Sequence, residues 1–140
     1  MVYTSTSAEQ TRQIAAEIAG RFKKRGGVVA LIGDLGAGKT TFAQGFSQAL
    51  GISGRIISPT FILIRQYPIP NSDRILYHLD LYRLVEGDNL NELGLAEVLG
   101  SPKNIVLVEW AEKILDQLPR QTLKIRFEKV AATERRLMVD

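Results

Sequence analysis

Gly33-Asp34-Leu35-Gly36-Ala37-Gly38-Lys39-Thr40 is the most informative stretch of this chain. It matches the phosphate-binding pattern G-x-x-x-x-G-K-[ST] at every fixed position. Backbone N–H groups converge on a phosphate only where side chains leave room for it, which explains the glycines. The lysine can reach the β- and γ-phosphates of a nucleotide, and the threonine hydroxyl can bind Mg²⁺. The stretch therefore predicts a P-loop and a nucleoside triphosphate site.

The residues on both sides of this loop predict a strand that enters it and a helix that leaves it. Val28 to Ile32 is an unbroken run rich in β-branched residues, typical of a strand buried on both faces. From Lys39 to Leu50, apolar side chains recur at helical spacing. Such a helix would point its positive dipole end at the phosphates. A chance match to the motif would have no reason to lie between two such elements.

The rest of the chain predicts more strands and helices. Ser7 and Gln10 form a capping box that predicts a helix start; its apolar stripe runs to Phe22, and Gly26-Gly27 ends it. A turn around Pro70 predicts a hairpin between residues 61–67 and 75–81. Short helices are expected at 90–99 and 111–118. Other strands are expected at 56–57, 105–108, 123–130 and 136–139.

Strands that alternate with helices predict an α/β fold. We expect a single P-loop NTPase-like domain over residues 1–140, with a mixed, mostly parallel sheet flanked by helices. The 140 residues are 45% hydrophobic and 24% charged, which excludes a disordered or collagen-like chain. The net charge of +3 is too small to indicate nucleic-acid binding by itself.

Composition also excludes several kinds of site. The sequence holds no cysteine and one histidine, so disulfides, thiolate zinc sites, cysteine nucleophiles and cages of several histidines are excluded. No apolar run approaches the ~20 residues that span a bilayer, and the polar first ten residues lack the pattern of an export signal. We therefore expect a cytoplasmic protein without membrane contact.

A P-loop needs an acidic group near its Mg²⁺, usually at the end of a neighbouring apolar strand. Glu109 follows the apolar run Ile105 to Val108, at the carboxyl edge where α/β sheets place ligands. An ordinary strand end would look the same, but the need of the loop for a partner favours the metal role. Asp80 is a second candidate, for holding Mg²⁺ or orienting the attacking water. The alternation of His78, Asp80 and Tyr82 fits equally well the polar outer face of an edge hairpin.

Three further features bear on the nucleotide. Ser58-Pro59-Thr60 lies where NTPases often place a switch that senses the γ-phosphate, although such a tripeptide is more often a plain turn. Trp110 is interpreted as a core or cap residue rather than a ligand. The Asn-Lys-x-Asp signature of a guanine pocket does not occur in the sequence, which favours ATP.

Four blocks of the sequence together resemble the TsaE (YjeE) family of P-loop ATPases of bacterial tRNA threonylcarbamoyladenosine biosynthesis. The blocks are Gly33 to Thr41, Ser58 to Phe61, His78 to Arg83 and Val108 to Trp110. The resemblance implies a cytoplasmic protein that binds ATP and Mg²⁺ and hydrolyses ATP weakly alone. It also implies partnership with TsaD and TsaB, which transfer the threonylcarbamoyl group to adenosine 37 of tRNAs reading codons that begin with A. Contact with tRNA would then be indirect.

The resemblance also implies roles for single residues. Thr40 and Glu109 would hold Mg²⁺, Asp80 and Glu109 would be catalytic, and the Ser58-Pro59-Thr60 loop would be the first switch. Glu9 and Arg135 would approach the rest of the nucleotide; their alternatives are a helix-dipole partner and a solvated strand charge. From its position at a helix start, and not from the resemblance, Lys39 is expected on the solvent side, with little part in the core. The implied nucleotide-binding residues are Gly36, Ala37, Gly38, Lys39, Thr40, Thr41, Glu9 and Arg135.

Two other classes of function remain open. A small-molecule P-loop kinase would share the front half of the chain, but no arginine-rich insertion of the kind such enzymes use occurs between residues 85 and 105. A nucleotide-dependent binding module without catalysis would also fit, although the presence of both Asp80 and Glu109 counts against it.

Overall fold

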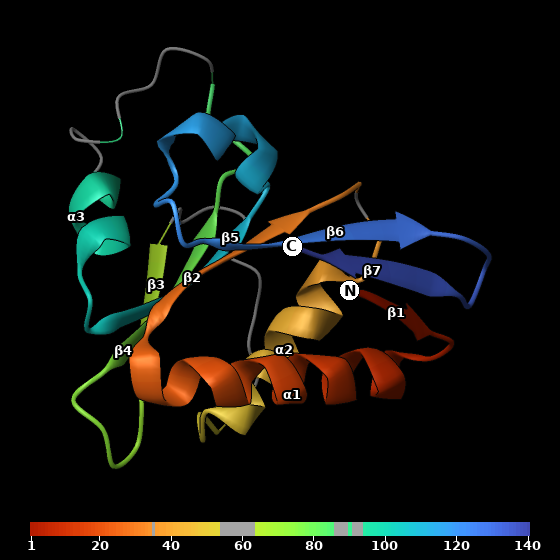
Figure 1. The fold of residues 1–140 in the computed structure, drawn as a ribbon, viewed down its shortest axis with the longest axis horizontal. Coiled ribbons are helices and arrows are strands. Elements are labelled where there is room, and N and C mark those ends of the chain that lie inside the picture. Colours follow the sequence, from red (N-terminus) through yellow and green to blue (C-terminus); the bar gives the residue numbers. More distant parts are fainter. Residues whose placement is uncertain (35, 54–63, 86–89, 91–93) are drawn as a thin grey trace.

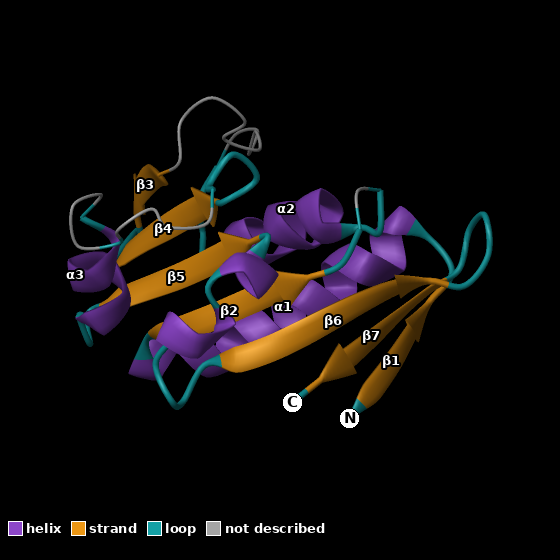
Figure 2. Cartoon of the chain, turned by 90° about the horizontal axis from the view of Figure 1, so that it is seen from above, coloured by secondary structure: helices purple, strands orange, loops and turns teal. Residues whose placement is uncertain are grey.

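A computed structural model describes residues 1–34, 36–53, 64–85, 90 and 94–140. In this part of the chain, a seven-stranded sheet has the strand order β1-β7-β6-β2-β5-β4-β3 (Figures 1 and 2). The strands are β1 (Val2–Ser5), β2 (Gly27–Ile32), β3 (Ile64–Pro68), β4 (Ile75–Asp80), β5 (Asn104–Glu109), β6 (Leu123–Lys129) and β7 (Arg135–Val139). The helices are α1 (Ala8–Arg25), α2 (Lys39–Ala49) and α3 (Leu95–Gly100), with 3₁₀ turns η1 (Ala111–Lys113) and η2 (Leu115–Gln117).

The sheet is parallel at its centre and antiparallel at both sides. Strands β6, β2, β5 and β4 run parallel. Strands β7 and β1 continue the sheet antiparallel on one side, and β3 forms the predicted hairpin with β4 on the other. The predicted mixed α/β sheet is confirmed. The two central strands of its parallel part, β2 and β5, are the two continuous apolar runs, and they are buried along their length apart from half-buried Gly27.

Helical layers cover both faces of the sheet. On one face α1 and α2 pack on the sheet through large aromatic side chains, Phe22, Phe42 and Phe46. On the other face α3 and the two 3₁₀ turns cover β2, β4 and β5, with Leu95 and Ile114 in a second core (Figure 2). No helix among the described residues is both long and apolar enough to cross a membrane.

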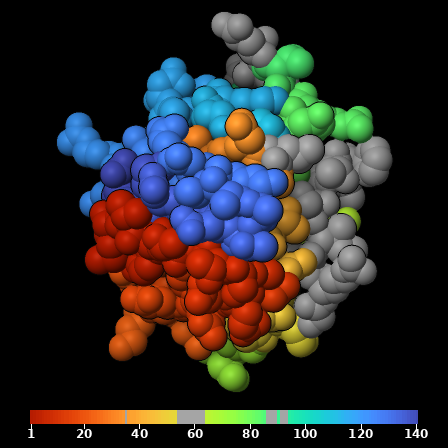
Figure 3. Space-filling view, turned by 90° about the vertical axis from the view of Figure 1, so that its right-hand side faces the viewer, coloured from red at the N-terminus to blue at the C-terminus, as the bar shows by residue number. Residues whose placement is uncertain are grey.

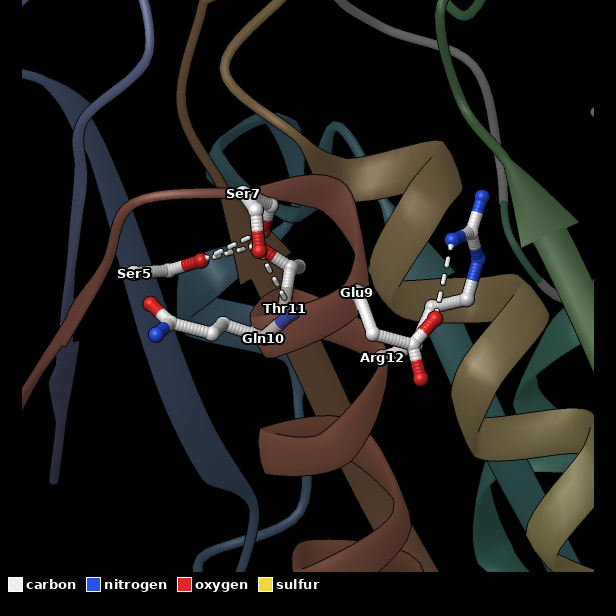
Figure 4. A network of polar contacts seen from close by, with 6 residues as sticks. All are labelled: Ser5, Ser7, Glu9, Gln10, Thr11 and Arg12. Carbon is white, nitrogen blue, oxygen red and sulfur yellow. Dashed lines mark hydrogen bonds and ion pairs between the residues drawn. The ribbon is translucent and has the colours of Figure 1, made fainter.

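Helix α1 begins as its sequence predicts. Ser7 Oγ accepts a hydrogen bond of 3.1 Å from the Gln10 N–H, in the network that Figure 4 shows. The second hydrogen bond of the capping box differs from the usual pattern, in which the Gln10 side chain would accept from the N–H of the cap residue Ser7. Instead, Gln10 Oε1 accepts from the N–H of Thr6, one residue before the cap, at 2.7 Å. The helix ends at Gly26, whose φ of 68° suits glycine.

Two parts of the chain differ from the sequence prediction. The first residues form the edge strand β1 on β7; Ser5 is buried, with its hydroxyl 2.7 Å from that of Thr11. The helix predicted over 111–118 is instead two 3₁₀ turns, because Ile114 interrupts it with φ −134° and inserts into the second core. The expected elements at 56–57, 58–60 and 61–63, and most of the first half of 90–99, lie outside the described residues.

Helices α1 and α2 approach each other closely at Gly45. A Cβ atom added there would lie 2.6 Å from both the Cα and the carbonyl oxygen of Arg12. Gly20 of α1 offers a contrast, because no atom lies within 4 Å of an added Cβ. The close packing of the P-loop helix α2 against α1 therefore depends on a glycine at position 45.

Gly45→Ala is expected to lower the free energy of unfolding by about 1–3 kcal/mol, since backbone atoms must move to admit the methyl group. The matched substitution Gly20→Ala should raise it by about 0.5–1 kcal/mol, because alanine favours an exposed helix interior over glycine. Urea unfolding of wild type and both variants measures whether each substitution lowers or raises the free energy of unfolding. A stabilising effect at Gly45 would contradict the close helix contact.

Candidate functional site

A cavity of about 320 Å³ opens at the carboxyl ends of β2, β4 and β5. This is the edge at which open parallel sheets bind ligands. The cavity brings together the P-loop, Asp80 and Glu109, which the sequence analysis placed at one site. Its lining consists of Gly36, Gly38, Lys39, Thr40, Thr41, Asp80, Tyr82, Glu109, Trp110 and Arg135.

The loop between β2 and α2 contains glycines with positive φ, a backbone conformation that residues with side chains rarely adopt. Gly36 and Gly38 have φ of 80° and 104°, and Gly38 is the residue at which α2 begins. The first turn of α2 therefore borders the cavity and presents its positive dipole end to it. Ala37 differs from its neighbours, because it is packed in the core and its N–H donates to Asp34 O at 3.1 Å. Leu35 lies outside the described residues.

Lys39 is buried, with 4% of its surface exposed, so the expectation of a solvent-side lysine is wrong. Its Nζ donates to Gly33 O at 2.5 Å and lies 3.8 Å from the centre of the Trp110 ring. Burial lowers the pKa of Lys39, and the nearby carboxylates, led by Glu112 and Glu109, offset only part of this effect. A cation shielded from water in this way attracts a phosphate more strongly than an exposed one would.

The two acidic candidates lie side by side on neighbouring strands. The parallel register of β4 and β5 sets Asp80 opposite Glu109, and both are buried. The Tyr82 N–H donates to Asp80 Oδ1 at 2.9 Å. Asp80 is only 4% exposed although β3 and β4 form the edge hairpin of the sheet, so its interpretation as part of a polar outer face is wrong.

His78 is the residue of this group whose role the sequence analysis did not identify. It is 1% exposed, and its Nε2 lies 2.6 Å from Glu109 Oε2. The alternation of polar and apolar residues from 78 to 82 was the sequence signal that His78 lies on the same strand face as Asp80. That prediction is correct for His78 and Asp80 but not for Tyr82. Tyr82 lies beyond the end of β4 and is 52% exposed.

Trp110 is both a cap and part of the site. It precedes η1 with a φ of 59°, an uncommon value for a residue with a side chain. Its ring centre lies 5.3 Å from that of Tyr82, and both rings line the cavity beside Lys39. The sequence interpretation as a cap is therefore incomplete, because an aromatic cap and an aromatic wall have the same sequence pattern.

Arg135 joins the P-loop to the turn between β6 and β7. Its Nη2 donates to Gly36 O at 3.3 Å, while its Nη1 donates to the carbonyl oxygens of Ala131, Ala132 and Glu134. A second cavity of about 360 Å³ adjoins the first and shares Gly38, Thr41 and Arg135 with it. Its remaining lining comes from both ends of the chain, which lie together in Figure 3: Thr6, Ser7, Ala8, Thr11, Ala132 and Thr133.

Glu9 lies apart from both cavities. Its side chain is 71% exposed and pairs with Arg12 at 3.6 Å, as Figure 4 shows. The neighbouring Ser7 and Ala8, rather than Glu9, line the second cavity. Its expected contact with the nucleotide stays a prediction.

The oxygen atoms at the first cavity suit Mg²⁺. Thr40 and Glu109 both line it, with Asp80 beside them. Protein sites for Mg²⁺ bound to nucleotides typically supply one or two carboxylates, and the phosphates and water supply the other ligands. The described residues contain no cluster of three or more His, Cys, Asp or Glu side chains suited to hold a metal by itself. A metal here would therefore need the nucleotide as a co-ligand.

Comparisons with known proteins agree on one family. The family model described as threonylcarbamoyl adenosine biosynthesis protein TsaE matches residues 5–137. The chain is 40% identical over 137 residues to the tRNA threonylcarbamoyladenosine biosynthesis protein TsaE of Bacillus subtilis, covering 96% of this chain and 82% of that protein. It is 36% identical over 136 residues to the protein of the same name from Treponema pallidum, covering 96% of both.

A solved structure has the same fold. The crystal structure of Bacillus subtilis YdiB superposes with a TM-score of 0.73 at 36% sequence identity. The superposition covers 98% of this chain and 82% of that one.

The lowered pKa of Lys39 predicts a pH dependence of stability without nucleotide. The folded protein releases this proton below the ordinary pKa of 10.5, so between the two pKa values the unfolded chain binds more protons. Wild-type stability should therefore rise with pH in that window relative to Lys39→Met, which has no such group. Urea unfolding of both proteins at about pH 7 and about pH 10 measures the difference. A relative fall toward pH 10 would contradict the lowered pKa.

Proposed function

The chain belongs to the TsaE family of threonylcarbamoyl adenosine biosynthesis proteins, and we propose that it serves tRNA modification as a Mg²⁺-dependent ATPase with weak activity of its own. The observation that carries the proposal is the cavity in which the P-loop, Asp80 and Glu109 meet. Family membership supports it over the small-molecule kinase and the binding module without catalysis.

The chain's own residues account for binding of the triphosphate. The N-terminus of α2 and the Lys39 ammonium both present positive charge to the first cavity. Lys39 would exchange its contact with Gly33 O for a phosphate oxygen. The second cavity, on the other side of Gly38 and Thr41, has room for the nucleoside part. Arg135 lines both cavities, and its hydrogen bond to Gly36 O would hold the P-loop in place between them.

Thr40 and Glu109 are the residues that would hold Mg²⁺. When bound, the ion neutralises charge on the phosphate oxygens. Asp80 would orient water; in support, the Tyr82 N–H donates to one of its oxygens and its side chain borders the cavity. The rings of Trp110 and Tyr82 would limit access of bulk water to this end of the cavity.

The contacts of Arg135 support the proposal that the isolated chain hydrolyses ATP slowly. Among the described residues that line the first cavity, Arg135 is the single arginine; backbone carbonyl oxygens accept hydrogen bonds from both of its terminal nitrogens, and its buried Nε has no hydrogen-bond partner there. A group supplied by a partner can raise hydrolysis at a P-loop by about 10³–10⁵. We propose TsaD and TsaB as those partners, in the cytoplasm, with tRNA reached through the complex that they form.

Phosphate release tests this proposal. The wild-type chain alone should turn over slowly, and purified TsaB–TsaD should raise the rate at least about tenfold, because the partners would complete the site. Asp80→Asn should abolish the stimulated rate while leaving ATP affinity within about threefold of wild type. The matched control is Asp73→Asn, in the exposed turn of the β3–β4 hairpin.

Asp73→Asn should behave like wild type in both assays. Rapid hydrolysis by the isolated chain that ignores TsaB–TsaD would contradict the partner-dependent ATPase. Absence of ATP binding would contradict the nucleotide site itself.

A further inference from the structure

We propose that His78 is a positioning residue that holds one oxygen of the Glu109 carboxylate so that the other is directed at Mg²⁺. The proposal deepens the proposed function and rests on it, since it concerns the metal of the nucleotide site. It stands on three observations: a short contact between two buried side chains, a ring nitrogen without a partner, and the place of His78 outside the cavity.

The contact joins neighbouring parallel strands. His78 on β4 is paired with Leu107 of β5, and Glu109 follows two residues later on the same face. The Nε2 of His78 lies 2.6 Å from Oε2 of Glu109, with 1% and 4% of the two side chains exposed. A carboxylate only accepts hydrogen bonds, so the ring donates from Nε2. Water has little access to compete for this bond.

The second ring nitrogen of His78, Nδ1, indicates why a histidine occupies this position. His78 Nδ1 is buried without a hydrogen-bond partner in the described part of the chain. A buried polar atom left in this way costs about 1–3 kcal/mol. An apolar side chain of similar size would avoid that cost if the position only filled space. The single satisfied contact of the ring, with Glu109, is therefore the reason to have a histidine here.

His78 acts through Glu109, because the cavity lining includes Glu109 but not His78. With Oε2 bound to the ring, Oε1 is the oxygen left for a ligand in the cavity. Mg²⁺ demands nearly ideal octahedral geometry and so gains from a carboxylate of fixed orientation. Hydrogen-bond partners behind metal ligands typically change metal affinity or activity by about 10–100-fold.

The test measures how strongly Mg²⁺ tightens nucleotide binding. Calorimetric titration with a non-hydrolysable ATP analogue, once in EDTA and once in excess Mg²⁺, yields the ratio of the two dissociation constants. His78→Leu removes the donor, and His78→Asn places its amide near the Nδ1 position, too short to reach Glu109. Both should reduce the ratio by about 10–100-fold while affinity in EDTA stays within about threefold of wild type.

His78→Gln is the rescue variant, because its amide nitrogen stands the same number of bonds from Cα as Nε2. It should restore the ratio to within about threefold of wild type. Tyr77→Leu is the control, since Tyr77 is the preceding residue of β4 and packs on the opposite core. It should change stability but not the ratio. In a Glu109→Gln background, His78→Asn should have no further effect on the ratio.

The outcomes separate the two proposals. A wild-type ratio in both His78→Leu and His78→Asn, or equal losses in His78→Gln and His78→Leu, would overturn the positioning role and leave the nucleotide site intact. If the wild-type protein binds no analogue in either condition, the proposed function fails and the role of His78 with it. Should His78→Leu not fold, the difference between His78→Asn and His78→Gln decides the matter.

Discussion

The parallel pairing of β2, β5 and β4 is the constraint on which the site depends. In this register Leu31, Glu109 and Asp80 lie at one level across three strands. The strands stay in register because their apolar side chains are buried in two cores, one on each face of the sheet. A slip of one residue would exchange the two faces and move Glu109 and His78 away from the P-loop helix. Packing far from the cavity thus fixes the positions of its acidic groups.

The cavity concentrates buried charge against the usual preference of a protein interior. Lys39, Asp80 and Glu109 are each at most 4% exposed. Burying charged groups costs free energy unless they are paired. Here Glu109 contacts His78, and the Lys39 ammonium lies over the Trp110 ring and is attracted by the nearby carboxylates. Such an arrangement is poorly explained by stability alone. This cluster of buried charges fits a site that binds a polyanion together with a divalent cation.

Much of this arrangement could be predicted from the sequence. The P-loop, β2, α1, α2 and β5 all follow from local pattern, because each carries its own periodicity or turn residues. Strand β1 was missed because four residues give too short a pattern. The burial of Lys39 and the contact of His78 with Glu109 could not be predicted, since each joins segments that only the tertiary fold brings together. The exposure of Glu9 is likewise set by which side of α1 faces the sheet.

The central claim is that the first cavity binds the phosphates of ATP through Lys39. Trp110 is the single tryptophan of the sequence, and its ring lies 3.8 Å from the Lys39 ammonium, so its fluorescence reports on this contact. Titration of the wild-type protein with ATP should give a saturable change in fluorescence. Lys39→Met keeps the side-chain stem and removes the charge, and it should weaken ATP binding, measured in parallel by calorimetry, at least about tenfold. Equal ATP affinity in the two proteins would contradict the account.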